Sequence, residues 1–519
     1  MKTARNLLLI CLLALIFRLV LGAAFVRFPG IADPNHYYNM GARLVEGQGF
    51  TIDYIWQYNR PPNAVAHPED HWMPLAAVLA AVPMSIFGIS TGASLVLFVA
   101  IGSLLPLIAY WGARQLKLQE STAYFAALTA AFMPELVLNS LRTDTTVPTA
   151  LFVCLSILLL NEGFWRGGWW RFALSGAMVG LAYLTRNDGL LLIPLLAAII
   201  IIYVIMRRKH RDIPFHWRGV AIWLAAMLLV MTPWLIRSWQ EFGALGSAET
   251  DDMFFFTDHS DHYAYGRHFT LETMLAAQTP AQIIGKRLFE MAAGVKVVIT
   301  GLGEVLAVGL LGGAAYLWMK RREDPKRLLA ALPVVLLLGG AFIAYTVFIP
   351  YKSQAGSFKK AFLMTAPLLL PIAALAIERA IPHLRWRYGV MGLSLLILAA
   401  FAADLVRLDA AAANYYLSRI QTMAAQAREL PDTNDDGQLI FMTQDPYMLS
   451  YVGLPSLMFP YENLDTTYEI AGRYGVDYLL MPSARPGIDL LLNGENDPRF
   501  NLIEQVPGTE YSFWRVGAE

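Results

Sequence analysis

Hydrophobic positions along this chain gather in long uninterrupted runs rather than in short alternating stretches. Runs of about 20 apolar residues, the length that crosses the hydrocarbon core of a bilayer, recur through the first four hundred positions. Eleven such runs predict a polytopic α-helical membrane protein with about eleven transmembrane helices. The predicted spans lie near residues 7–27, 92–112, 121–138, 146–161, 172–186, 189–206, 219–236, 298–319, 328–348, 361–380 and 389–407.

One further apolar run, Met73–Phe87, is shorter than the others and follows the polar stretch HPEDHW. If this run does not span, every basic cluster falls on the side of the amino terminus, and positively charged loops stay cytoplasmic. We therefore expect a helix on the outer interface here, with the amino terminus inside and the carboxyl terminus outside a plasma or inner membrane. The basic clusters are Lys2 and Arg5, Arg114 and Lys117, Arg166 and Arg171, the stretches 207–218 and 320–327, and Arg385 and Arg387.

The last part of the chain lacks long apolar runs. Short strands are predicted around 437–443, 456–460 and 476–481, and a helix at 466–475 ends at a glycine. This alternation predicts a small extracytoplasmic α/β domain at 408–519, after a transmembrane catalytic domain at 1–407 with outer loops 28–91 and 237–297. The stretch DTNDDG at 432–437 resembles the start of a calcium loop, but Thr443 stands where a bidentate Glu is expected, so we favour a turn.

Composition agrees with a membrane protein. Of the 519 residues 56% are hydrophobic and only 15% charged, whereas a soluble protein carries about a quarter charged residues. The formal net charge is zero, and we expect membrane lipids rather than nucleic acid as partners. The two cysteines, Cys11 and Cys154, both lie inside apolar runs, which indicates core packing rather than a disulfide or a metal site.

Two acidic residues stand at the outer ends of different predicted helices. Asp33 follows the first apolar run and is either a solvated loop residue or a catalytic carboxylate at the membrane surface. Asp144 stands just before an apolar helix, where it either caps that helix by accepting backbone N–H groups or faces the same cavity as Asp33. Because basic residues also stand at outer helix ends, we favour a shared site.

Four basic residues on the predicted outer face also need an explanation, because positive charge is depleted there. They are Arg186 in TRND, Arg237 in PWLIRSW, and Lys359 and Lys360 in SFKKAF. An anionic ligand such as a phosphate is one explanation, and side chains that reach toward lipid headgroups are the other.

The first outer loop adds His67, Glu69, Asp70 and His71, and the stretch 251–268 adds further Asp and His residues. Such clusters can hold a divalent cation, but no spacing here is diagnostic. A metal site is therefore the minority interpretation, and no cofactor is assigned. The aromatic residues of both loops fit anchoring at the membrane interface.

An ordered series of stretches resembles the GT-C membrane glycosyltransferases, with the protein O-mannosyltransferase and aminoarabinose transferase group as the nearest relatives. The stretches are ARLVEGQGF after Asp33, SLRTDTTVPTALF, GLAYLTRNDGLLLIP, PWLIRSWQEFG and FKKAFLMTAPLLLP, and the resemblance covers residues 1–410. It implies transfer of a sugar from a polyprenyl-phosphate donor to a protein, lipid or glycan acceptor on the outer face, with inversion.

The resemblance places the catalytic base on Asp33. Many relatives carry Asp-Glu at this point, whereas this chain has Asp33-Pro34, so a second carboxylate would come from Glu69 or Asp70. The later Arg-Tyr position of the family appears as Lys359 and Lys360, without a tyrosine. Two alternatives stay open: a transporter or flippase of lipid-linked sugars, and a polysaccharide polymerase or ligase that does not use Asp33 as its base.

Overall fold

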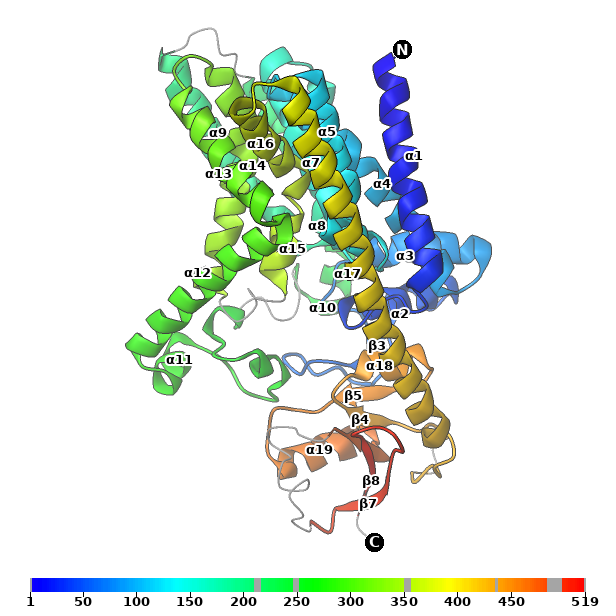
Figure 1. Cartoon of the computed structure of the whole chain (residues 1–519). Coiled ribbons are helices and arrows are strands. Elements are labelled where there is room, and N and C mark those ends of the chain that lie inside the picture. Colours follow the sequence, from blue (N-terminus) through cyan, green and yellow to red (C-terminus); the bar gives the residue numbers. More distant parts are fainter. Residues whose placement is uncertain are drawn as a thin grey trace.

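The computed structural model describes residues 2–209, 216–245, 252–349, 356–434, 437–482 and 497–517 (Figure 1). A bundle of long helices makes up most of the molecule, and a small sheet lies beyond one end of it. The bundle contains α1 (Lys2–Phe25), α4 (Thr91–Gln115), α5 (Glu120–Phe132), α6 (Pro134–Ser140), α7 (Thr146–Arg166), α8 (Trp169–Thr185), α9 (Leu192–Lys209), α10 (Trp217–Phe242), α12 (Pro280–Leu302), α13 (Glu304–Met319), α14 (Pro325–Ile343), α15 (Ser357–Leu363), α16 (Ala366–Ala380) and α17 (Leu384–Ala427).

The polytopic helical fold is confirmed. Seven of the described helices are long and apolar enough to cross a membrane, or ten if each of three bent pairs counts as one span. The pairs are α5 with α6, α12 with α13, and α15 with α16, bent by 50°, 106° and 60°. The remaining predicted span falls on α8, whose 17 residues rise about 26 Å. Met73–Phe87 corresponds to α3 (Leu75–Phe87), whose 13 residues rise only about 20 Å.

Close approach between helices depends on glycine. A Cβ added at Gly176 of α8 would lie 2.0 Å from the Trp223 carbonyl oxygen of α10. A Cβ added at Gly313 of α13 would lie 1.9 Å from the Ile372 carbonyl oxygen of α16. The two helix pairs therefore pack backbone against backbone, as small residues permit inside a membrane.

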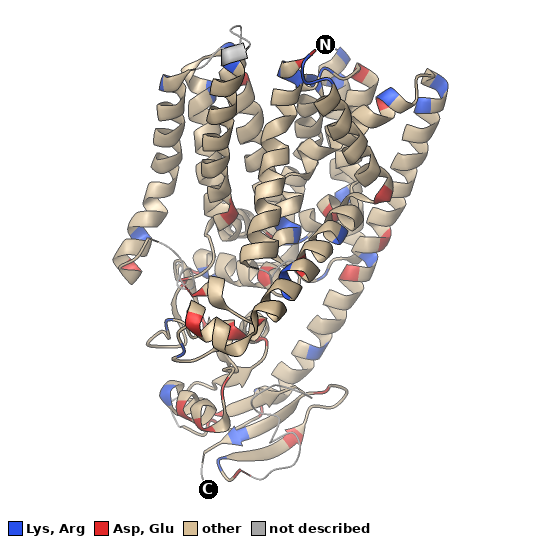
Figure 2. Ribbon diagram, turned by 90° about the vertical axis from the view of Figure 1, so that its left-hand side faces the viewer, with Lys and Arg blue, Asp and Glu red and all other residues tan. Residues whose placement is uncertain are grey.

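Basic loops meet at the end of the bundle where the amino terminus lies, and Figure 2 shows Lys and Arg gathered there. Lys117 after α4 pairs with Asp324 before α14 at 2.8 Å. Arg387 at the start of α17 donates to the Gln119 side chain before α5 at 2.9 Å. Three of the predicted basic clusters thus share one end of the molecule.

The opposite end carries a six-stranded sheet with the order β2-β5-β4-β6-β8-β7. Parallel pairing joins β4 to β5 and β6, whereas β8 is antiparallel to β6 and β7. The strands are β2 (Tyr54–Ile55), β4 (Phe441–Thr443), β5 (Ser456–Met458), β6 (Tyr478–Met481), β7 (Phe500–Gln505) and β8 (Ser512–Val516), with α18 (Pro446–Tyr451) and α19 (Leu464–Tyr474) between them. The three predicted strands and the helix that ends at a glycine, Gly475, are confirmed. Residues 435 and 436 of the DTNDDG stretch lie outside the described residues.

The first outer loop is built into this sheet. It contributes β2, which pairs in parallel with β5, and its helix α2 (Asp33–Val45) carries Asn35 and Asn39. Both amide groups donate to the Tyr447 carbonyl oxygen, at 2.7 and 2.8 Å. The same loop forms a two-stranded sheet from β1 (Thr51–Ile52) and β3 (His67–Pro68). Helix α17 runs without a break through positions 407 and 408, the predicted domain boundary, and ends beside the sheet (Figure 1).

Candidate active site

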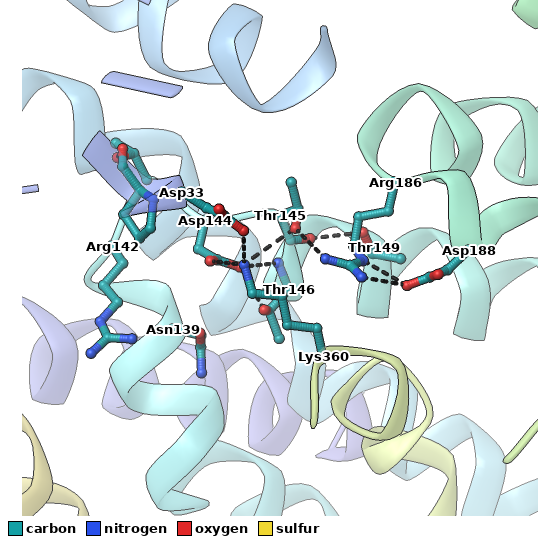
Figure 3. Close-up of polar contacts among 12 residues, drawn as sticks. Asp33, Asn139, Arg142, Asp144, Thr145, Thr146, Thr149, Arg186, Asp188 and Lys360 are labelled. Atoms are coloured by element: carbon teal, nitrogen blue, oxygen red, sulfur yellow. Dashed lines mark hydrogen bonds and ion pairs between the residues drawn. The ribbon is translucent and has the colours of Figure 1, made fainter. Parts of the chain in front are cut away.

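Lys360 lies between Asp33 and Asp144 (Figure 3). Its Nζ is 2.8 Å from Asp33 Oδ2 and 2.6 Å from Asp144 Oδ2. The lysine comes from α15, Asp33 is the first residue of α2, and Asp144 stands in the turn between α6 and α7. Three residues that the sequence singled out on separate segments therefore meet at one point, between the helical bundle and the sheet.

Asp33 owes its position to a tight turn. Gly30 has a φ of 123°, and a Cβ there would lie 2.7 Å from the Pro34 Cβ, so no larger residue fits. Ala32 has a φ of 65° and a ψ of −128°, a conformation that costs free energy for a residue with a side chain. Pro34 then occupies the first turn of α2, where its missing N–H is harmless. This backbone presents the Asp33 carboxylate at a helix N-terminus, which favours negative charge.

Asp144 is the more deeply held of the two acids, since only 2% of its side chain is exposed. Its Oδ1 accepts the Thr146 backbone N–H at 2.8 Å and the Thr146 hydroxyl at 2.6 Å, while its Oδ2 accepts from Lys360. Helix capping and a shared site with Asp33 are therefore compatible roles for Asp144. One of its oxygens binds the start of α7, and the other accepts from Lys360, which also contacts Asp33. Burial raises the pKa of Asp144, but Lys360 and these hydrogen bonds lower that pKa below its ordinary value.

Asp33 is the accessible acid of the pair, with 41% of its side chain exposed. The protein around Asp33 excludes water from part of the carboxylate, and this desolvation raises its pKa. The charge of Lys360 and its hydrogen bond outweigh desolvation and hold the pKa of Asp33 well below the ordinary value. The charge of Arg186 acts in the same direction. Asp33 is thus an ionised carboxylate with a partly exposed side chain.

Arg186 borders the same cluster. Its Nε and Nη2 lie 2.7 and 2.6 Å from Asp188 Oδ2, and its Nη1 donates to the Thr145 hydroxyl at 3.4 Å (Figure 3). The Tyr345 hydroxyl donates to the other oxygen of Asp188. Tyr345 lies in a π-helical turn, η4 (Ala344–Phe348), which extends α14. The guanidinium therefore reaches the Asp144 turn while an acid and a tyrosine fix its orientation.

The adjacent residues Lys359 and Lys360 bind different acids. Lys359 pairs with Glu135 at 2.8 Å, at the start of α6, whereas Lys360 faces Asp33 and Asp144. Pro134 ends α5, because the ring excludes the preceding residue from helical geometry, and the resulting bend points Glu135 toward α15. Of the predicted pair, the described contacts place Lys360 alone between the two acids.

Arg237 binds protein rather than this cluster. Its guanidinium donates to the Glu69 and Phe50 carbonyl oxygens at 3.0 and 2.9 Å, and lies 4.5 Å from the centre of the Trp234 ring. These contacts fasten the first outer loop to α10. The predicted role in binding a donor phosphate stays a prediction, and the described contacts give Arg237 a structural role.

Glu69, one of the four polar residues predicted in the first outer loop, makes its printed contacts within that loop. Glu69 is fully buried, and its Oε1 accepts the backbone N–H groups of His71 and Trp72 at 2.7 and 2.6 Å. Its Oε2 is 3.6 Å from His36 Nε2. Burial and the charge of Asp70 raise the pKa of Glu69 well above its usual range.

His67 binds the Val65 carbonyl oxygen at 2.8 Å, and with Asp70 it lines a groove of about 330 Å³ between the loop and the end of α10. No group of three or more His, Cys, Asp or Glu converges on a metal position among the residues that the structure describes. Asp33 and Asp144 converge on the Lys360 ammonium.

Sequence reasoning missed several residues of the cluster. Asp188 stands two positions after Arg186 in TRND, a spacing that allows an arginine to bind its own neighbour, so the signal was present. Tyr345 gave no signal, since it lies within an apolar run. Arg142 and Thr143 precede Asp144 in the stretch SLRTDTTVPTALF, but the sequence pattern assigns them no role.

One family model matches part of the chain, and solved structures share its fold. Residues 66–236, about a third of the chain, match the family model described as dolichyl-phosphate-mannose-protein mannosyltransferase. A comparison with curated proteins finds no match.

Solved structures match over nearly the whole chain. The crystal structure of ArnT from Cupriavidus metallidurans bound to undecaprenyl phosphate has a TM-score of 0.61 at 14% identity and covers 97% of both chains. The apo form of that protein has a TM-score of 0.63, also at 14% identity, over 99% of this chain and 98% of the other. The oligosaccharyltransferase AglB from Archaeoglobus fulgidus, in complex with an inhibitory peptide and a dolichol-phosphate, has a TM-score of 0.57 at 12% identity, over 99% of this chain and 74% of its own. The GT-C fold is confirmed, as is the resemblance to the O-mannosyltransferase and aminoarabinose transferase group.

Proposed function

We propose that this multi-pass membrane protein with the GT-C fold is a glycosyltransferase that uses a polyprenyl-phosphate sugar as its donor. The acceptor is a hydroxyl or phosphate of a protein, lipid or glycan on the outer face of the membrane. The observation that carries this proposal is the position of Lys360 between a buried acid and an accessible one, Asp144 and Asp33. The ArnT structure bound to undecaprenyl phosphate and the AglB structure in complex with a dolichol-phosphate support a lipid phosphate as the carrier.

Asp33 acts as the base in this proposal. The acceptor O–H gives its proton to the Asp33 carboxylate as the acceptor oxygen attacks the anomeric carbon of the donor. The bond from that carbon to the phosphate oxygen breaks, and the carrier phosphate leaves with the electron pair. A single displacement of this kind inverts the anomeric centre and needs one carboxylate, whereas the hydrolytic glycosidases, retaining and inverting alike, use two.

Positive charge stabilises the departing phosphate. A phosphate is already a good leaving group, so its departure depends on fixed positive charges more than on a general acid. Lys360 and Arg186 supply two such charges within one cluster, and both are held by acids before the donor arrives. We propose that the donor phosphate draws the Lys360 ammonium from Asp33, which frees that carboxylate to accept a proton.

The direction of the fold in the membrane belongs to the same proposal. We infer that the end of the bundle with the basic loops is cytoplasmic, because positively charged loops are retained there. The cluster and the sheet then lie on the extracytoplasmic side. A long prenyl chain stays in the lipid while its phosphate and sugar reach Asp33.

Sugar transfer by the purified protein in lipid tests this function. A panel of radiolabelled polyprenyl-phosphate sugars is offered with a mixed extract of envelope lipids, glycans and proteins, and wild type is compared with Asp33→Asn. We expect transfer by wild type and a loss of about 100-fold or more in the variant, with carrier binding retained, because general bases contribute on this scale. Equal transfer by both proteins would remove Asp33 as the base. Movement of the carrier between leaflets without transfer would favour the flippase alternative.

A further inference from the structure

The turn that carries Asp144 touches three separate parts of the molecule through three consecutive residues. Asp144 faces Lys360 of α15. Thr143 is fully buried; its N–H donates to the Pro29 carbonyl oxygen at 3.4 Å and its hydroxyl to that of Pro34, so it holds the loop on either side of Asp33. Arg142 points away from Lys360, as Figure 3 shows, and reaches α17.

Arg142 binds both carboxylate oxygens of Asp409 of α17 along one edge of its guanidinium. Its Nε is 3.1 Å from Asp409 Oδ2, and its Nη2 donates to Asp409 Oδ1. About a quarter of each side chain is exposed, 27% for Arg142 and 28% for Asp409. Two parallel hydrogen bonds from a planar guanidinium to a carboxylate fix an angle as well as a distance. This pair is therefore a stiffer link than a lysine could provide.

The helix at the other end of this link also holds the Asp33 side of the site. Asn414, five residues after Asp409 on α17, donates to the Phe25 carbonyl oxygen at 2.9 Å, at the end of α1 where the Asp33 loop begins. Gly30 in that loop lies close to the Arg142 side chain, since a Cβ there would be 3.5 Å from its Cγ. One rigid helix thus contacts the segments that carry both acids.

We propose that Arg142 and Asp409 are positioning residues, which set the distance between Asp33 and Asp144 and so keep Lys360 between them. This inference rests on the proposed function for its kinetic consequences only. The pair itself contacts neither Lys360 nor Asp33 among the described hydrogen bonds and ion pairs. Removing it leaves the three residues of the cluster intact but lets the Asp144 turn shift relative to α2.

The test uses Arg142→Gln, Asp409→Asn and the charge-swapped pair Arg142→Asp with Asp409→Arg. The matched control is Asp404→Asn, which removes an exposed ion pair with Arg407 from the same helix. All are full-length proteins purified in lipid. For sugar transfer we expect kcat to fall about 10-fold or more in both single variants, because small displacements of reacting groups have large effects. The KM for the donor stays within about threefold, and the swapped pair recovers most of kcat.

A second readout does not depend on activity. The rate at which an amine-reactive reagent modifies Lys360 is followed by mass spectrometry, with Lys359 on the same peptide as the internal control. We expect Lys360 to react several-fold faster in Arg142→Gln and Asp409→Asn, with Lys359 unchanged in both variants and neither lysine changed in Asp404→Asn. Equal acceleration of both lysines would mean general loosening and would overturn the proposal, as would an Asp409→Asn protein that matches the control. If wild type transfers no sugar, the proposed function fails while the labelling result still decides the role of this pair.

Discussion

The ammonium of Lys360 lies 2.6 Å from Asp144 Oδ2, which joins α15 to a turn more than two hundred residues earlier in the chain. Its neighbour Lys359 pairs instead with Glu135 at 2.8 Å. Two adjacent lysines of one short helix therefore serve different partners. This difference makes them a matched pair for experiments on the site.

We expect Lys360→Gln to reduce sugar transfer and donor binding by more than 10-fold, whereas Lys359→Gln changes either by about threefold at most. Removal of one hydrogen-bond donor aimed at the developing negative charge of an oxyanion hole costs roughly 10²–10³ in rate. The measurements are kcat, KM and carrier binding for both variants. Equal losses would mean that the ion pair of Lys359 with Glu135 matters as much as the ion pairs of Lys360 with Asp33 and Asp144.

The same substitution has a consequence for the pH dependence of the rate. Burial raises the pKa of Asp33, and the charge of Lys360 lowers it below the ordinary value. In Lys360→Gln burial is no longer opposed by Lys360, so the pKa of Asp33 rises and the acid limb of kcat/KM moves to higher pH. A profile of residual activity from pH 4 to pH 8 checks this shift. An unchanged acid limb would show that Asp33 is not the group that titrates in the free enzyme.

Asp144 and Asp33 differ in what they do for stability. Asp144 is 2% exposed and binds Thr146 and Lys360, whereas Asp33 is 41% exposed. We expect Asp144→Asn to lower the free energy of unfolding by about 2–3 kcal/mol, since it weakens a buried charged network. Asp33→Asn should cost about 1 kcal/mol or less. Thermal unfolding in one detergent or lipid, compared for the two variants, measures the difference, and an equal drop would contradict it.

Much of the fold could be predicted because the bilayer imposes a length and a polarity on each helix. Apolar runs and basic loops are strong signals, and the runs match the observed helices. The strand β2 could not be predicted as part of the sheet, because Tyr54 and Ile55 lie some four hundred residues from their partners Ser456 and Leu457. Two residues carry no periodicity, and only tertiary contact makes them a strand.

The candidate site, like the fold, could be predicted from the sequence only in part. Asp33, Asp144, Arg186 and Lys360 were predicted because charges at the ends of membrane helices are unusual, and the structure brings these four together. Arg237 has the same sequence signal, yet its guanidinium binds two carbonyl oxygens of the first outer loop. Sequence identifies a charge that needs a partner, but it does not tell whether that partner is a ligand or the backbone of the protein itself.

Arg237 should therefore matter for the loop more than for the donor. Arg237→Gln loses two charged hydrogen bonds, to Glu69 and Phe50, and the contact with Trp234. We expect the free energy of unfolding to fall by about 2 kcal/mol. Proteolysis of the first outer loop should be faster, while the KM for the donor stays within about threefold. A large rise in KM without faster proteolysis would restore Arg237 as a phosphate ligand.

Glu69 gives a pH dependence of opposite sign to that of a salt-bridged acid. Burial, followed by repulsion from Asp70, raises the pKa of Glu69 to about 8 from an ordinary 4.5. Between these values the folded protein binds more protons than the unfolded chain, so this group makes stability fall as pH rises. His36 opposes the effect below about pH 6.5, because burial lowers its pKa from 6.5 to about 3 and the unfolded chain then binds a proton that the folded protein does not.

We expect Glu69→Gln to remove the loss of stability that Glu69 causes between pH 5 and pH 8, because glutamine does not ionise. Over that range wild type should lose several kcal/mol relative to the variant, at about 1.4 kcal/mol per pH unit for one proton. The melting temperature at four pH values measures the difference, with Glu504→Gln on exposed strand β7 as the control. Parallel curves for wild type and Glu69→Gln would show that Glu69 is already ionised in the folded protein. In that case it would be available as the second carboxylate that the Asp33-Pro34 sequence lacks.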